Sequence, residues 1–76
     1  MKKASSTSVA KFMKEYLSQD NDGEFITEEN ARKAMSEIIT EYENAYAGVE
    51  NDKFGVRKFI VKSVKTRTVY FDTKVR

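Results

Sequence analysis

The feature that most limits the possible folds of this chain is the absence of cysteine from its 76 residues. A chain this short buries a smaller share of its surface than a large domain does, so its hydrophobic core is small. Other small domains compensate with disulfides or thiolate-bound metals, and neither can form without cysteine. We therefore expect one small domain over residues 1–76, with residues 1–7 as a flexible N-terminus. A homodimer is the remaining source of buried area.

The composition is that of a folded globular domain. Hydrophobic residues make up 39% of the chain and charged residues 34%, and five Phe and four Tyr argue against a disordered segment. No apolar run can span a membrane, since the longest, such as Phe59–Val61 and Val69–Phe71, hold three residues. The first residues also lack the apolar segment of a signal peptide. We expect a cytoplasmic protein with no membrane partner.

Two segments have the apolar spacing of amphipathic helices. In the first, this spacing follows several possible N-caps at residues 5–8 and predicts a helix over residues 8–18. In the second, Thr27 is a possible N-cap, and the spacing then continues for five turns up to Gly48, predicting a helix over residues 28–47. The periodic residues are Val9, Phe12, Met13, Tyr16 and Leu17 in the first helix and Ala31, Ala34, Met35, Ile38, Ile39, Tyr42, Ala45, Tyr46 and Val49 in the second.

The last third of the chain has the pattern of strands. Residues 68–75 alternate apolar and polar side chains, which is typical of a strand with one buried face. Residues 56–64 fit both a helical stripe and a strand. Because a lone strand leaves its backbone groups without partners, we interpret residues 56–64 as the second strand of a hairpin that turns at residues 65–67. The predicted fold class is α+β, with two N-terminal helices packed on a C-terminal antiparallel β-hairpin.

The segment SQDNDGEFITEE, residues 18–29, is similar to the calcium loop of an EF-hand. Five positions carry the residue types that this loop requires, namely Asp20, Asp22, Gly23, Phe25 and Glu29. Ser18 stands where the motif has its first carboxylate, so one negative charge is missing. The alternative is a plain turn at Asp22–Gly23 followed by a helix start, and the missing charge favours it. We predict no metal site.

The residue types that most often carry catalysis are missing. The chain has no histidine and no cysteine, the commonest general base and the strongest nucleophile. Its three glycines, Gly23, Gly48 and Gly55, stand alone and form no phosphate-binding loop. We expect a protein that is not an enzyme and that uses no cofactor.

Charge is unevenly distributed along the chain. Residues 1–14 carry a net charge of +4, residues 15–52 carry −9, and residues 53–76 carry +7, although the whole chain carries only +2. Such segregation is a clue to binding partners rather than to the fold. The basic final third also contains aromatic residues, a combination that suits a phosphate backbone with adjacent bases.

We predict that this basic ribbon binds nucleic acid, with DNA favoured. The candidate contacts are Arg57, Lys58, Lys62, Lys65, Arg67, Tyr70, Lys74 and Arg76, with Tyr70 able to stack on a base or lie against a sugar. Lysines on an exposed ribbon also prevent sheet aggregation, and here they can face the acidic middle of the same chain. The alternative is a small regulator or inhibitor that binds a larger protein through its charged faces.

The segment Ile26–Ala34 resembles the start of the second helix in HU/IHF-type DNA-bending proteins. Apolar positions that follow it, such as Met35, and Phe54–Gly55 before the basic ribbon extend this resemblance over roughly residues 8–65. The resemblance implies an intertwined dimer that grips DNA by charge. The chain has no proline, whereas members of the family carry an intercalating proline at each arm tip. It therefore implies binding without strong kinking of the DNA.

Overall fold

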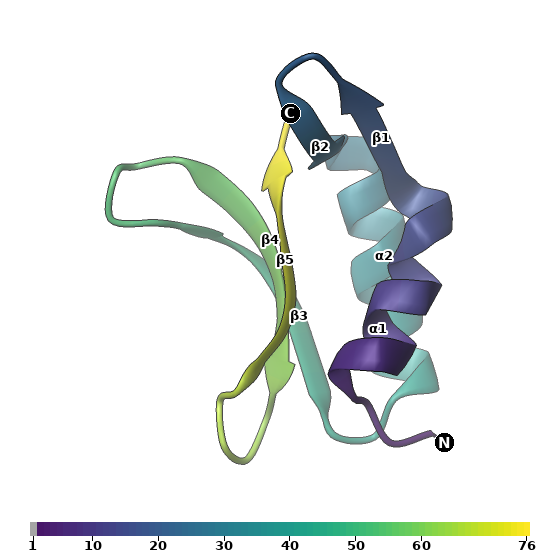
Figure 1. Ribbon diagram of the computed structural model, residues 1–76. Coiled ribbons are helices and arrows are strands. Elements are labelled where there is room, and N and C mark those ends of the chain that lie inside the picture. The colour runs from purple at the N-terminus through teal and green to yellow at the C-terminus, as the bar shows by residue number, and fades with distance from the viewer. Residues whose placement is uncertain (1) are drawn as a thin grey trace.

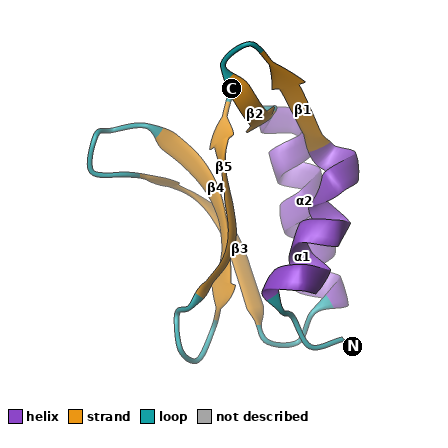
Figure 2. Ribbon diagram, in the orientation of Figure 1, coloured by secondary structure: helices purple, strands orange, loops and turns teal. Residues whose placement is uncertain are grey.

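The computed structural model of this chain describes residues 2–76 and has an α+β fold. Figure 1 shows the helices on one side of a strongly curved sheet, and Figure 2 separates helices from strands by colour. In chain order the elements are α1 (Ser6–Met13), a 3₁₀ turn η1 (Lys14–Tyr16), β1 (Leu17–Asp20), β2 (Gly23–Ile26), α2 (Glu28–Glu41), β3 (Ala45–Asn51), β4 (Arg57–Ser63) and β5 (Val69–Val75).

The five strands form one mixed sheet in the order β1-β2-β5-β4-β3. Neighbouring strands are antiparallel except β2 and β5, which run parallel where Phe25 lies opposite Lys74 and Ile26 opposite Val75. Arg76 N donates to the Ile26 carbonyl at 2.9 Å, and Glu28 N donates to the Arg76 carbonyl at 3.1 Å. The end of the chain is therefore held between β2 and the start of α2.

The core lies between the helices and the sheet. Its largest fully buried side chains come from both layers and are Phe59, Met13, Ile26, Ile38, Val9 and Val61. Ala31 and Ala34 let α2 approach the sheet closely, and both are buried. The apolar spacing identified these helix residues correctly, because the buried side chains of an amphipathic helix repeat every three to four positions.

The second helix is shorter than its apolar spacing predicts. Its start is confirmed, since the Thr27 hydroxyl accepts a hydrogen bond from Asn30 N at 3.2 Å and α2 begins at Glu28. The predicted end at residue 47 is wrong, because α2 ends at Glu41 and residues 45–51 form β3. Ala45 and Val49 fit the helical spacing and also a period of two that includes Ala47, and pairing with β4 decides between the two patterns.

The first helix also ends early, and its predicted extension to residue 18 is wrong. Leu17–Asp20 forms β1, which pairs with β2 across a tight turn at Asn21–Asp22. Gly23, at φ 106°, follows this turn in a conformation that glycine adopts easily, and the predicted turn is confirmed. The two predicted C-terminal strands are confirmed as β4 and β5. The sheet is nevertheless larger than the predicted hairpin, since β1, β2 and β3 add to it.

The N-terminal segment runs beside the end of α2. Lys2 N donates to the Glu41 carbonyl at 2.9 Å, and Glu43 N donates to the Lys2 carbonyl at 3.0 Å. Ala4 belongs to the buried core, whereas Met1, the first residue of the predicted flexible segment, lies outside the described residues. Over residues 2–76, none of the helices has the length and apolar character needed to cross a membrane.

Candidate binding surface

The helices cover one face of the sheet and leave the other uncovered (Figure 1). Strand registers and burial place alternate residues of β3, β4 and β5 on this uncovered side, because successive side chains of a strand point to opposite faces. We call this side the open face. Its central residues are Tyr46, Gly48 and Glu50 of β3, Lys58, Ile60 and Lys62 of β4, and Asp72 and Lys74 of β5.

Three of the predicted nucleic-acid contacts are paired with acids of the same chain. Lys62 Nζ lies 2.8 Å from Glu50 Oε2 on the open face, and Arg57 Nη2 lies 3.2 Å from Glu28 Oε1 at the start of α2. Arg76 forms ion pairs with acids of the β1–β2 turn. The acidic middle of the chain therefore neutralises part of the basic final third.

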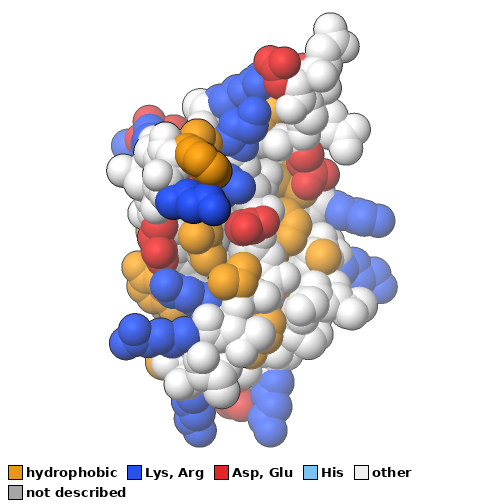
Figure 3. Space-filling view, turned by 60° about the vertical axis from the view of Figure 1, so that its left-hand side comes forward, with side chains coloured by type: hydrophobic (Ala, Val, Ile, Leu, Met, Phe, Trp, Pro, Cys, Tyr) orange, Lys and Arg blue, Asp and Glu red, His pale blue; other side chains and the backbone are white. Residues whose placement is uncertain are grey.

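Four other predicted contacts form no ion pair with residues 2–76. Lys58 and Lys74 lie opposite each other on β4 and β5, near the end of the open face where β2 joins the sheet. Lys65 and Arg67 are exposed in the turn between β4 and β5, at the other end of these strands. The four predicted contacts without an ion pair thus lie at opposite ends of β4 and β5. Figure 3 shows basic, acidic and apolar side chains interspersed across the view.

Tyr70 differs from the other predicted contacts because its side chain packs against the hydrophobic core. It lies at the bulge where the β4–β5 register shifts, between the pairs Val61–Phe71 and Lys62–Val69. Its hydroxyl accepts a hydrogen bond from Asn44 Nδ2 at 3.4 Å. This half-buried ring is therefore held against the core on the helix side of the sheet and is not displayed on the open face.

The open face also contains residues that sequence reasoning assigned to the second helix. The ring of Tyr46 lies over Gly48, where an added Cβ atom would come within 2.8 Å of the Tyr46 hydroxyl. Lys62 Nζ stands 5.8 Å from the centroid of this ring. The alternation of Ala45, Tyr46 and Ala47 was the only available signal for a strand, and it is weak because the same residues suit a helix.

Two shallow depressions open onto this surface. The larger, of about 470 Å³, is lined by Glu24, Asp52, Val56, Lys58, Asp72, Thr73 and Lys74. The smaller, of about 330 Å³, is lined by Tyr46, Glu50, Lys62, Ser63, Val64 and Arg67. Both are open and mix charges of opposite sign with apolar groups, whereas small-molecule sites are usually concave and mostly apolar.

The turn between β3 and β4 presents an aromatic side chain at one end of the open face. Phe54 is 79% exposed, and Lys53 Nζ lies 5.2 Å from the centroid of its ring. Asp52 holds the turn, because its Oδ1 atom accepts hydrogen bonds from Phe54 N at 2.8 Å and Val56 N at 2.9 Å. An ordered turn that exposes a phenylalanine can contribute apolar contact area to a partner.

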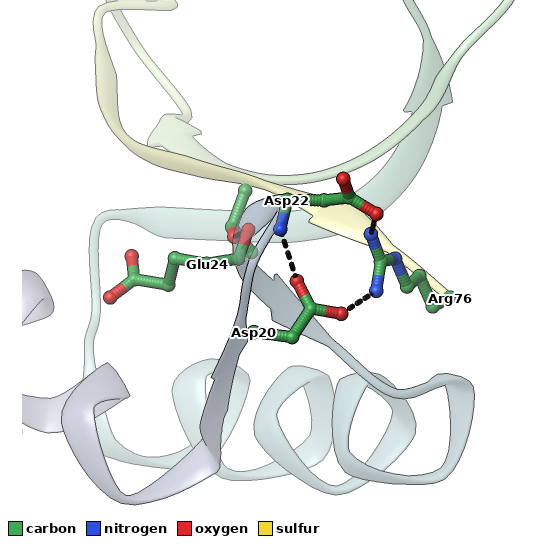
Figure 4. Close-up of polar contacts among 5 residues, drawn as sticks. Asp20, Asp22, Glu24 and Arg76 are labelled. Carbon is green, nitrogen blue, oxygen red and sulfur yellow. Dashed lines mark hydrogen bonds and ion pairs between the residues drawn. The ribbon is translucent and has the colours of Figure 1, made fainter.

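The segment similar to a calcium loop forms an antiparallel hairpin instead of a loop between two helices. Figure 4 shows the carboxylates of Asp20 and Asp22 directed at the guanidinium group of Arg76, whose Nη2 atom lies 3.0 Å from Asp22 Oδ2. Glu29 is elsewhere, 3.5 Å from Lys33 along α2. Within residues 2–76, no cluster of three or more His, Cys, Asp or Glu side chains is arranged to hold a metal ion.

The pKa of Asp20 is lower than that of an ordinary aspartate. Desolvation, the largest single influence, raises the pKa, but the hydrogen bond from Asp22 N and the contacts with Arg76 together outweigh it. A lowered pKa in the folded state stabilises the fold at higher pH, and this contribution disappears as pH falls through the folded pKa. The corner formed by Asp20, Asp22 and Arg76 is therefore sensitive to acid.

We expect Arg76→Gln to raise the pKa of Asp20 towards the ordinary aspartate value, because the guanidinium group no longer favours the carboxylate. The free energy of unfolding then depends less steeply on pH over roughly pH 5 to 2 than in the wild type. Titration of the Asp20 carboxyl carbon by NMR, with urea denaturation at each pH, measures both quantities. Identical titration curves in the two proteins would show that Arg76 does not lower the pKa of Asp20.

Comparison of the chain with protein-family models, with curated proteins and with solved structures found no match. The functional argument therefore depends on the geometry of the open face and on the chemistry of its residues.

Proposed function

We propose that this chain is a small non-enzymatic binding module that docks on another protein through its open face. The observation that carries the proposal is that the face opposite the helices is uncovered and combines exposed aromatic and apolar groups with charges. Protein interfaces have this make-up, with aromatic and aliphatic contacts at the centre and polar groups around them.

Apolar groups run across the open face from strand to strand. Tyr46 is 48% exposed on β3, Ile60 is half-buried on β4, and Val69 is 49% exposed at the start of β5. Phe54 adds a fourth apolar group at the β3–β4 turn. Covering these side chains removes apolar surface from water, which is the main favourable contribution to most protein associations.

The charges of the open face indicate what the partner carries. Lys62 is already compensated by Glu50, whereas Lys58 and Lys74 form no ion pair with residues 2–76. A partner with an apolar centre covers the apolar groups of the open face, and carboxylates on that partner pair with these two lysines. Asp72, on β5 opposite Ile60, is an acid of the open face that forms no ion pair with residues 2–76, and it then fixes the orientation of the partner by repelling misplaced carboxylates.

Nucleic-acid binding, with DNA favoured, is the second candidate, and it is favoured by the four predicted contacts that form no ion pair with residues 2–76, namely Lys58, Lys65, Arg67 and Lys74. The HU-like resemblance belongs to this candidate and stays a prediction. Glu50, Asp72 and the acids of the β1–β2 turn lie among the bases and would repel phosphates. Each phosphate neutralised by a lysine or arginine would add to the salt dependence of binding, so this candidate predicts affinity that falls steeply with salt.

Two measurements separate the candidates. The first is a gel shift with duplex DNA, single-stranded DNA and RNA at low and physiological salt, which we expect to show no specific complex. The second is photo-crosslinking from Tyr46 in lysate of the source organism, compared with crosslinking from Ile39, which is 56% exposed on α2. A protein crosslinked from Tyr46 but not from Ile39 supports docking through the open face. Tight, salt-sensitive binding to a nucleic acid would overturn it.

A further inference from the structure

We propose that the open face receives an acidic amphipathic helix of its partner, which lies across β3, β4 and β5. This inference rests on the proposed docking function and adds to it the secondary structure, the direction and the charge of the partner segment. The order of apolar and basic side chains along the strands and the curvature of the sheet support it.

An apolar band crosses the open face from strand to strand. Tyr46 of β3 pairs with Lys62 of β4, which in turn pairs with Val69 of β5, so Tyr46 and Val69 lie in one row across the strands. Ile60 lies two residues before Lys62 and therefore on the same face. Val64 directly follows β4, is 61% exposed and lines the same depression as Tyr46. We call Tyr46, Ile60, Val64 and Val69 the apolar band.

Basic residues lie on both sides of the apolar band. Lys58 and Lys74 pair with each other on the side of the β3–β4 turn, and Lys65 and Arg67 are exposed in the β4–β5 turn on the other side. None of the four forms an ion pair within the part of the chain that the structure describes. Asp72 lies beside the band on β5 and disfavours carboxylates over the band itself. An apolar stripe with carboxylates along both of its sides matches this arrangement.

The open face offers side chains to a partner rather than backbone groups. The backbones of β4 and β5 pair with a neighbouring strand on each side, and β3 pairs with β4. A segment that lies on this face must therefore satisfy its own backbone hydrogen bonds, and an α-helix does so within one segment. An extended segment instead binds by adding to the edge of a sheet.

The open face is the concave side of the sheet. Figure 1 shows the β3–β4 and β4–β5 turns curving away from the helices, so the middle of the sheet lies nearer to the helices than its two ends do. Lys58 and Lys65, on opposite sides of the band, are separated by at most about 23 Å at about 3.3 Å per residue. A helix with its side chains is about 10–12 Å wide, which leaves about 6 Å on each side for lysine side chains to reach its carboxylates.

The apolar band sets the direction and the length of the helix. β3 and β5 are two strand spacings apart, about 10 Å at about 4.8 Å per spacing. A helix along the band therefore contacts Tyr46 and Val69 with residues about six to seven positions apart, at about 1.5 Å per residue. With one further turn at each end, the partner segment has about 14 residues.

The first test uses a synthetic helical peptide as the probe. The peptide has about 15 residues, with leucines at every third or fourth position and glutamates on both sides of the leucine stripe. We expect it to shift the NMR signals of the Tyr46, Ile60 and Val69 amides with a dissociation constant below about 1 mM. A control peptide with lysine in place of every glutamate should leave them unmoved. No shift with the acidic peptide at millimolar concentration, or equal shifts with both peptides, would overturn the proposal.

Reversing one base on each side of the band is expected to weaken binding of the acidic peptide. Lys58→Glu with Lys65→Glu should raise its dissociation constant at least about tenfold, because both rows of carboxylates then meet a like charge. Lys11→Glu with Lys14→Glu is the control, since these exposed lysines lie on the helix side and the net charge changes equally. Equal weakening in the two double variants would show attraction by net charge and would overturn the proposal.

The second test uses the natural partner and separates this inference from the proposed function. Photo-crosslinkers replace Tyr46 and Val69, one at a time, in lysate of the source organism, and mass spectrometry identifies the attached residues of a captured protein. A helix along the band predicts attachment sites about six to seven positions apart, whereas an extended segment predicts about three.

A spacing of about three, or attachment to unrelated segments of the captured protein, would overturn the helix and leave docking through the open face intact. Capture of no protein from either position would count against the proposed function. The titration with the synthetic peptide then still decides whether the open face accepts an acidic helix, because that measurement needs no natural partner.

Discussion

Phe59→Ala is expected to unfold this protein at room temperature. Phe59 is the largest of the fully buried side chains and lies on the helix side of β4, the strand between β3 and β5. Removing a buried phenylalanine side chain costs about 3–5 kcal/mol, and a domain of this size without disulfides or metals has only about 3–5 kcal/mol of stability in total. Circular dichroism with urea denaturation measures the loss.

Phe54→Ala is the matched control for this prediction, because Phe54 is 79% exposed at the β3–β4 turn. The same chemical change should there leave the free energy of unfolding within about 0.5 kcal/mol of the wild type. A folded Phe59→Ala variant with nearly wild-type stability would show that the core is not arranged around β4. Equal losses at both positions would show that Phe54 is also buried in solution.

Reversing the two unpaired lysines of the open face is expected to lower affinity for a crosslinked protein partner by at least about 100-fold. Lys58→Glu with Lys74→Glu places two carboxylates opposite those proposed for the partner, and like charges brought together at an interface cost several kcal/mol. Isothermal titration calorimetry with the purified partner measures the change. Most of the loss is expected to remain at high salt, because covered charges are weakly screened.

The control applies the same change of charge to α1 and the adjoining turn η1. Lys11 and Lys14 are exposed on the helix side of the molecule, and Lys11→Glu with Lys14→Glu alters net charge equally. The control variant should keep its affinity within a few-fold of the wild type. If both double variants lose affinity equally, attraction by net charge rather than docking through the open face explains the binding.

Sequence reasoning found the basic residues of the candidate surface but not how they are used. It placed Arg57, Lys62 and Arg76 on a free ribbon, and the fold brings each of them to an acid from a distant part of the chain. Ion pairs between residues far apart in sequence leave no local pattern. The alternative considered from the sequence, that basic residues face the chain's own acids, therefore holds for these three.

The apolar part of the surface was hidden for a different reason. Tyr46 continues the helical spacing of α2, and only pairing with Lys62 across β3 and β4 turns it to the open face. Phe54 lies at the tip of that same hairpin, which the sequence did not predict. Because the sequence did not predict β3, neither Tyr46 nor Phe54 was part of the predicted surface.

The sequence by itself determined the parts of this protein that depend on neighbours along the chain. The Thr27 cap, the buried stripe of α2, the turn before Gly23 and the alternation of β5 all follow from contacts within a few residues. The tertiary structure alone decided where α2 ends, that β2 pairs in parallel with β5, and which charges stay unpaired. The parallel pairing and two of the ion pairs depend on partners 29 to 54 positions away, and the end of α2 depends on the pairing of β3 with β4; single-chain periodicity contains no signal for either.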